Sequence, residues 1–232
     1  MLKKYIRTTS WAILTTLTVL SLTGFFLDDG GDSITSNTPT DPDTVFNSFP
    51  PEFFTSYNKT FNFTGSSNLG DTLTATFSQQ TMSETVFLST PAIPILTQQQ
   101  VTNTETGAIA NAVGNAYYST SASDRRYLGH DGDTFTVSAI TSPIPETAKI
   151  GDIGVIGTYT QNDGSVTTQS WRLDDGSNGR GELVLLFTHK DQFDNLEYNE
   201  TQKFLIDTSG NVLTMRIVLS YADGTIISFS GS

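Results

Sequence analysis

The chain has 232 residues, of which 36% are hydrophobic and 16% are charged, and its formal net charge is −12 at pH 7. This length suits one domain, or two small ones, with a sizeable core. The acidic charge argues against nucleic acid as a partner, because such a surface repels phosphates. The lack of cysteine excludes disulfides, Cys-ligated metal centres and thiol nucleophiles, and two histidines leave little for metal or triad chemistry.

The first 27 residues have the organisation of an export signal. Lys3, Lys4 and Arg7 are the only charged residues before Asp28, and residues 11–27 form an uncharged stretch. The stretch is weakly apolar and short for a membrane-spanning helix, so it favours a signal peptide. An uncleaved anchor through the same residues is the alternative, and would be the only membrane contact that we expect.

The end of this segment resembles the lipobox of bacterial lipoproteins. Leu22, Thr23 and Gly24 match the residues that precede the lipidated cysteine, but Phe25 stands where the cysteine would be. Without a thiol there is no thioether lipid. Three interpretations remain: a lipoprotein-derived sequence that lost its cysteine, ordinary signal cleavage near Gly24, or an uncleaved anchor. All three imply export, with this stretch as a processing site in the first two.

The next two segments differ sharply in composition. Residues 28–45 are rich in Asp, Ser, Thr, Gly and Pro without periodicity, which predicts a disordered tether. Residues 46–63 then carry seven aromatic side chains, which we expect to dock on the core of a single β-rich domain over residues 46–232. A ligand-stacking platform is the alternative. The seven are Phe46, Phe49, Phe53, Phe54, Tyr57, Phe61 and Phe63.

The rest of the chain alternates apolar and polar residues with period two, as half-buried β-strands do. Residues 212–221 are the clearest example, with Met215, Ile217 and Leu219 on one face and Thr214 on the other. Asp-Gly and Ser-Gly turns at suitable spacing predict an antiparallel meander of six strands between residues 153 and 230. Further strands are predicted near residues 60–65, 72–78, 81–89, 94–104, 115–120 and 134–140.

One segment does not fit this pattern clearly. Residues 106–118 are rich in alanine and predict either a short helix or a poorly apolar strand, and Gly107 and Gly114 weaken the helix. If it were helical, residues 108–116 could form a lid over a half-barrel.

The fold class predicted from these patterns is all-β. We expect an antiparallel meander of about ten to twelve strands that forms a barrel, a half-barrel or a two-layer sandwich. The signal, the tether and the meander with its Asp-Gly turns together resemble uncharacterised bacterial exported, lipoprotein-like β-rich envelope proteins. That resemblance implies a location in the bacterial periplasm or cell envelope and assigns no activity.

The residues capable of chemistry give weak signals. His189 ends an apolar strand face, which favours a structural role, and His130 lies in a Gly-Asp turn string without a second histidine nearby. The acidic loops 174–179 and 191–197 lack the spacing of a calcium-binding loop and fit hairpin turns. We therefore predict no catalytic residue, no metal site and no cofactor, and the sequence leaves the ligand-binding residues undefined.

Three functions remain open on the sequence. The first is a non-catalytic binding or structural domain of the envelope, with an envelope protein, a glycan or an apolar small molecule as its partner. The second is an extracellular adhesin or filament subunit, which requires a free strand edge. The third is a carboxylate-dependent hydrolase acting on envelope polymers, which requires a cleft with two acids of different pKa. The balance is against an enzyme.

Overall fold

The computed structural model describes residues 38–132 and 136–232. The predicted signal peptide and its processing site, Leu22 to Phe25, lie outside the described residues. No helix in the described ranges is long and apolar enough to cross a membrane. These ranges contain one short 3-10 helix, η1 (Ala122–Asp124), and fifteen strands. The strands are β1 (Val45–Asn47), β2 (Asn58–Ser67), β3 (Thr72–Thr81), β4 (Thr85–Phe87), β5 (Thr90–Asn103), β6 (Ile109–Ser119), β7 (Tyr127–His130), β8 (Thr136–Thr141), β9 (Thr147–Lys149), β10 (Ile153–Gln161), β11 (Val166–Asp175), β12 (Gly181–Lys190), β13 (Leu196–Ile206), β14 (Val212–Tyr221) and β15 (Ile226–Gly231).

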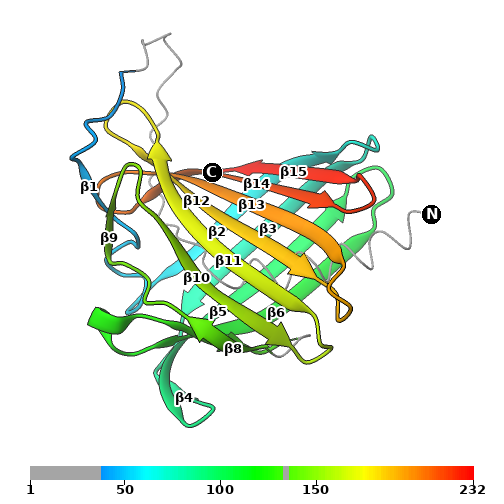
Figure 1. The fold of residues 1–232 in the computed structure, drawn as a ribbon. Helices are drawn as coiled ribbons and strands as arrows, with labels where there is room; N and C mark the ends of the chain where they lie inside the picture. The colour runs from blue at the N-terminus through cyan, green and yellow to red at the C-terminus, as the bar shows by residue number, and fades with distance from the viewer. Residues whose placement is uncertain (1–37, 133–135) are drawn as a thin grey trace.

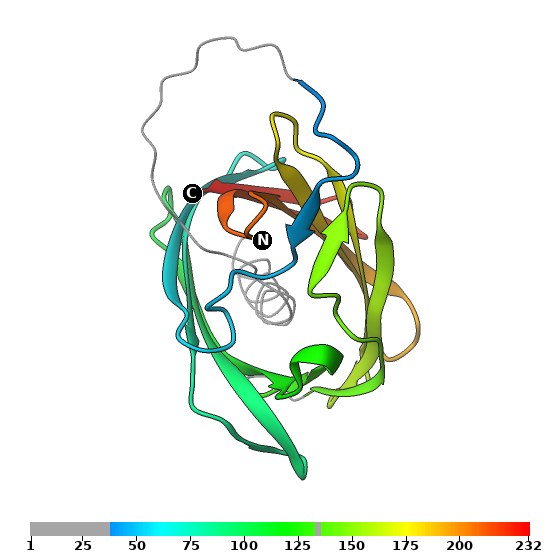
Figure 2. The same cartoon turned by 90° about the vertical axis from the view of Figure 1, so that its left-hand side faces the viewer.

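The strands form an antiparallel barrel (Figures 1 and 2). A 13-stranded sheet runs in the order β3-β2-β15-β14-β13-β12-β11-β10-β8-β7-β6-β5-β4, and β3 also pairs with β5. That last pairing joins the two sides, so every strand of the sheet except β4 belongs to a ring. The pairing around the ring is shortest at β7, which pairs with only a few residues of β6 and β8. The all-β prediction is confirmed, and the sheet takes the barrel form among the three that were expected.

The C-terminal half matches the predicted six-strand meander. Strands β10 to β14 each pair with the next strand along the chain, so β10 to β15 form one meander. Gly164 and Gly224 lie in the predicted hairpin turns with φ of 86°, a left-handed conformation that costs glycine little. Ile217 is buried and Thr214 is exposed, as the alternation of β14 predicted.

The N-terminal half departs from the predicted strands in three places. Residues 109–119 form β6 in the barrel wall, so the strand alternative for this segment is confirmed and the helical lid over residues 108–116 is wrong. Pairing of this segment with β5 along its length overrides its weak local preference. The strand expected over residues 81–89 is limited to β4, which projects from the barrel with the start of β5 (Figures 1 and 2). The short strands β1, β7 and β9 were not predicted.

The aromatic segment closes one end of the barrel. We call residues 46–57 the plug, and they cross the mouth of the ring in Figure 2. Phe46, Phe53 and Tyr57 are at most 1% exposed, and the Phe53 ring packs 5.1 Å from Tyr57, centroid to centroid. The backbone of Tyr57 accepts a hydrogen bond from Thr81 N at 2.8 Å. The predicted docking of this segment on the core is confirmed.

The turn between β13 and β14 depends on a glycine that touches the plug. Gly210 has a φ of 82°, and a Cβ at this position would lie 2.7 Å from the carbonyl oxygen of Phe49. Asn47 N also donates to Thr208 O at 3.0 Å in the same turn. Contacts of the domain begin earlier still, within the predicted tether: Thr40 N donates to Asp175 Oδ1 at 3.1 Å.

Candidate ligand site inside the barrel

The inner face of the barrel carries many polar side chains among its apolar ones. Directly opposite residues on paired strands share a face of the sheet, so partners of core residues face inward. Gln202 pairs with Leu185 and Ile217, which are both buried in the core. The buried polar residues that face the interior in this way include Gln79, Thr97, Gln99, Gln161, Thr167, Gln169, His189, Glu200 and Gln202.

Two hydrogen-bonded pairs on the inner face, Tyr159 with Gln169 and Gln202 with Glu200, make up what we call the inner polar cluster. All four are 0% exposed. Gln202 Nε2 donates to Glu200 Oε1 at 2.6 Å, and the Tyr159 hydroxyl donates to Gln169 Oε1 at 3.4 Å. Phe187 separates Gln169 from Glu200 across the neighbouring strands. The cluster thus places a carboxylate and two amides in the middle of the barrel wall.

Several interior polar atoms have no hydrogen-bond partner in the described part of the chain. They are Gln79 Oε1, Thr97 Oγ1, Gln99 Oε1, Gln169 Nε2 and Gln202 Oε1. A buried amide or hydroxyl without a partner costs about 1–3 kcal/mol, so proteins rarely keep several together without a use for them. All five atoms belong to side chains on the inner face of the barrel.

One wall of the interior is built from small residues. Ala110, Ala112, Gly114 and Ala116 of β6 lie opposite inward-facing residues of β5, with Ala112 paired to Gln99. A ring of about eight strands is just wide enough for its own side chains to fill. The ring here has twelve strands and is correspondingly wider, and the β6 side chains that line it are short. An apolar crevice of the interior is lined by Phe63, Ala75, Phe77, Gln99, Ile217, Leu219 and Phe229.

His189 lies at the barrel end opposite the plug, in a hydrogen-bonded row. Its Nε2 is 3.1 Å from Glu197 Oε2 and its Nδ1 is 2.8 Å from Thr167 Oγ1, while its ring stacks on Tyr198 with centroids 4.7 Å apart. Burial lowers the pKa of His189 and raises the pKa of Glu197. Thr167 is 1% exposed and the Glu197 side chain is 51% exposed. A nucleophilic hydroxyl and its supporting acid need the reverse, an accessible hydroxyl and a buried acid. This row therefore fits a structural role.

The other candidate residues from the sequence hold turns and strand ends. His130 is buried beside Tyr127, whose hydroxyl lies 2.7 Å from His130 Nδ1. Asp131 Oδ1 accepts from Asn115 N at 2.9 Å, and in the acidic loop 191–197 Asp191 Oδ1 accepts from Asn195 N at 2.9 Å. Within residues 38–132 and 136–232, no group of three or more His, Asp or Glu side chains is placed to hold a metal ion.

Acidification is expected to destabilise the fold through its buried histidines. Burial lowers the pKa of His130 from 6.5 to about 4 and also lowers that of His189. Between these pH values the two histidines are protonated in the unfolded chain but stay neutral in the folded one. The free energy of unfolding therefore falls as the pH drops from about 6.5 towards 4. His130 alone accounts for up to about 3 kcal/mol over this window. Urea unfolding at a series of pH values measures the slope, and His130→Gln should flatten it; an unchanged slope in this variant contradicts the assignment.

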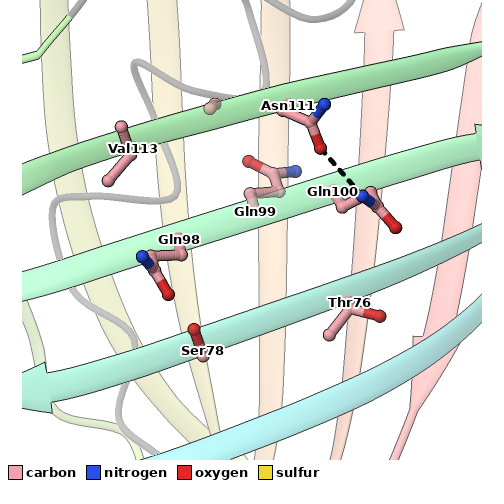
Figure 3. A pocket seen from close by; sticks show the side chains of 8 residues that line it. Thr76, Ser78, Gln98, Gln99, Gln100, Asn111 and Val113 are labelled. Carbon is pink, nitrogen blue, oxygen red and sulfur yellow. Dashed lines mark hydrogen bonds between the residues drawn. The ribbon is translucent and has the colours of Figure 1, made fainter.

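The outer face carries a second concave surface, formed by β3, β5 and β6 (Figure 3). It is an open groove of about 500 Å³. Gln100 Nε2 donates to Asn111 Oδ1 across it at 2.9 Å, and no side chain that lines it is charged. The outward side chains of the groove are Thr76, Ser78, Gln98, Gln100, Asn111 and Val113.

Sequence reasoning missed the interior polar residues. In β3, β5 and β13, glutamines occupy positions whose alternation places them with the core residues: Gln79 follows Phe77, and Gln202 precedes Phe204. The signal for them is a polar residue at a position where the alternation of the strand calls for an apolar one. That signal could have identified inward-facing glutamines in each strand separately. That several strands bring these residues around one interior follows only from ring closure.

Comparisons with known proteins leave the chain without an assigned family. No family model matches it, and no curated protein matches it. One solved structure, described as "a putative lipoprotein from Parabacteroides distasonis", is 10% identical, with 77% of this chain and 95% of that chain covered and a TM-score of 0.33. These values are too low to indicate a shared function.

Proposed function

We propose that this protein is an exported, non-catalytic binding protein of the bacterial cell envelope that holds an elongated, largely apolar molecule inside its barrel. The observation that carries the proposal is the inner face itself. A ring of twelve strands brings aromatic and aliphatic side chains together with buried amides that have an unpaired atom among the described residues, such as Gln99 and Gln169. A mostly apolar lining with a few polar groups is typical of sites that bind small amphipathic molecules.

The two ends of the barrel differ in a way that supports a bound ligand. Phe49, Phe53 and Phe54 of the plug form a cluster with ring centroids 4.9–5.3 Å apart, which keeps water from one end. The opposite end carries the polar row around His189. An amphipathic molecule would therefore enter with its apolar part towards the plug. The export signal read from the sequence supports a location in the envelope, where such molecules are abundant.

The rival functions have less support. An adhesin or filament subunit needs a long free strand edge, but nine residue pairs join β3 to β5 and close the sheet. A hydrolase needs an accessible nucleophile or an acid pair across a cleft, and the row around His189 exposes only its carboxylate. Neither rival explains the buried amides.

The proposal is tested by filling the interior from its small-residue wall. Ala112→Phe should weaken binding of a fluorescent fatty acyl probe at least about tenfold, because the new ring occupies the ligand's volume. Val113→Phe is the matched control, since Val113 is the next residue of β6 and faces outward. Thermal unfolding confirms that both variants fold.

Native mass spectrometry of the protein recovered gently from its own host is the second readout. A mass above the processed chain that disappears on denaturation identifies a bound molecule. Equal probe binding by the two variants, or no probe binding by the wild-type protein, would contradict the interior site.

A neutral glycan on the outer groove is a second candidate. Its support is the uncharged row of amides and hydroxyls in Figure 3, which can exchange hydrogen bonds with sugar hydroxyls. Gln98→Ala combined with Gln100→Ala should abolish binding to a polysaccharide from the host envelope and leave binding of the acyl probe unchanged. Each proposed site is therefore tested with its own ligand and its own variants: the acyl probe with Ala112→Phe, and the polysaccharide with Gln98→Ala and Gln100→Ala.

A further inference from the structure

Three of the buried polar residues on the inner face are close neighbours, and we call them the deep polar site. Gln79 of β3 is the register partner of Thr97 of β5, and Gln99 follows two residues later on the same face of β5. Paired residues on adjacent strands have Cβ atoms about 4.5–5.5 Å apart, and residues two apart on one strand are separated by about 7 Å. The three side chains therefore lie within reach of one small chemical group.

Each residue of the deep polar site has a buried atom that lacks a hydrogen-bond partner in the described part of the chain. The atoms are Gln79 Oε1, Thr97 Oγ1 and Gln99 Oε1, in residues that are 2%, 1% and 8% exposed. Lys59 is the register partner of Gln79 on β2, but it does not provide a partner for Gln79 Oε1. Carbonyl oxygens need a donor, and a threonine hydroxyl donates or accepts. A ligand hydroxyl fits this set, because it donates to an amide oxygen and accepts from Thr97.

The deep polar site lies one layer of side chains inside the plug. Thr81, two residues after Gln79 on β3, donates from Oγ1 to Phe53 O at 2.6 Å and from N to Tyr57 O at 2.8 Å. Gln79 is about 7 Å further along the strand, towards the end of the barrel that carries His189. A ligand whose head group lies at the His189 end therefore brings the far end of its chain to the deep polar site.

The surroundings of the deep polar site suit an apolar chain. Gln99 pairs with Phe77 on β3 and lines the apolar crevice together with Ile217 and Leu219. On β6 its partner is Ala112, whose side chain is a single methyl group. A chain that lies along this crevice ends beside Gln99, where a polar group on that end meets amides as well as hydrocarbon.

We propose that the deep polar site receives a hydroxyl group at or near the end of the ligand's chain, so that the barrel prefers hydroxylated acyl chains to plain ones. This inference rests on the proposed function. It goes beyond that function by stating that the buried end of the ligand is itself polar, and by naming Gln79, Thr97 and Gln99 as the residues that select it.

The test adds a hydroxyl to the far end of an acyl chain. Displacement of the fluorescent acyl probe is measured with saturated fatty acids over a series of chain lengths and with their ω-hydroxy counterparts. At the length that reaches the deep polar site, the ω-hydroxy acid should bind at least about tenfold more tightly than the plain acid. A wholly apolar interior would give the opposite sign, because a hydroxyl buried without a partner weakens binding.

Two variants of similar shape test the residues themselves. Gln79→Met and Thr97→Val remove polar atoms of the site, so each should bring the ω-hydroxy acid to within about threefold of the plain acid. Gln80→Met is the matched control, since Gln80 is the next residue of β3 and is exposed on the outer face. It should leave the preference intact.

Two further readouts do not depend on the variants' affinity for the ω-hydroxy acid. The ω-methoxy acid accepts hydrogen bonds but cannot donate them, so it should show no gain over the plain acid on the wild-type protein. In urea unfolding of the ligand-free protein, Gln79→Met and Thr97→Val should not lower the midpoint, because the oxygen atoms that they remove have no partner to lose among the described residues.

The failures are distinguishable. If no fatty acid, plain or hydroxylated, displaces the probe, the interior is not a ligand site and the proposed function fails with the inference. If plain and ω-hydroxy acids bind equally, or if Gln79→Met and Thr97→Val keep the preference, the deep polar site is overturned while the interior site stands.

Two other results would overturn the assignment of a hydroxyl. A lower urea midpoint in both variants would mean that these side chains serve the fold, for example through a buried water. Tighter binding of the α,ω-dicarboxylic acid than of the ω-hydroxy acid would mean that an anion is held near Lys59 instead.

Discussion

Replacing Ile217 by Asp is expected to lower the free energy of unfolding by about 3–5 kcal/mol. Ile217 is 3% exposed on the inner face of β14 and lines the crevice beside Leu219 and Phe229. An aspartate there carries a charge into an apolar wall that has no cation to pair with it among the residues lining the crevice. Urea denaturation followed by tryptophan fluorescence measures the loss.

The control for this variant is on the same strand. Thr214 is exposed on the outer face of β14, so Thr214→Asp should cost less than about 1 kcal/mol. The two substitutions introduce the same side chain at positions three residues apart. Equal effects at both positions would mean that the inner and outer faces of β14 have been assigned wrongly.

Removing the central ring of the plug should have a comparable effect. Phe53 is 0% exposed and its ring lies within 6.4 Å, centroid to centroid, of Phe49, Phe54, Tyr57 and Tyr118. Phe53→Ala leaves a cavity among these rings, and such substitutions cost about 3–5 kcal/mol. Thermal or urea unfolding measures the loss of stability.

An exposed phenylalanine provides the matched control for the plug. Phe193 lies 75% exposed in the turn between β12 and β13, so Phe193→Ala should change stability by less than about 0.5 kcal/mol. If Phe53→Ala were equally mild, the plug would be a loosely attached segment. The barrel would then be stable without it, and closure of that end could not contribute to holding a ligand.

The local patterns of the chain predicted the wall of the barrel well but not its shape. The alternation in residues 212–221 and the Asp-Gly turns specified strands, hairpins and faces in the C-terminal half, because each of these depends on neighbours in the sequence. Residues 106–118 were ambiguous for the same reason: alanine favours no face strongly, and only pairing of Ala112 with Gln99 and its neighbours makes this segment a strand.

The candidate site was less predictable than the fold. Gln169 and Gln202 belong to separate strands, and a glutamine in a strand usually faces solvent. The local sequence already argued against catalytic roles for His189 and His130, and in the structure both rings have polar partners. The sequence could not indicate that Tyr159, Gln169, Glu200 and Gln202 all lie on one inner face, since that placement requires the correct order of strands across the sheet.

The sequence by itself determined that this chain is an all-β protein with an aromatic segment that docks on its core, because period-two burial and turn chemistry are local properties. Only the tertiary structure decided that the sheet closes. Closure depends on pairs such as Leu73 with Asn103, and on Phe63 pairing with Gly231 near the opposite end of the chain. Such pairs are set by register and curvature accumulated over all the strands, and they alone turn scattered glutamines and one glutamate into a single enclosed surface.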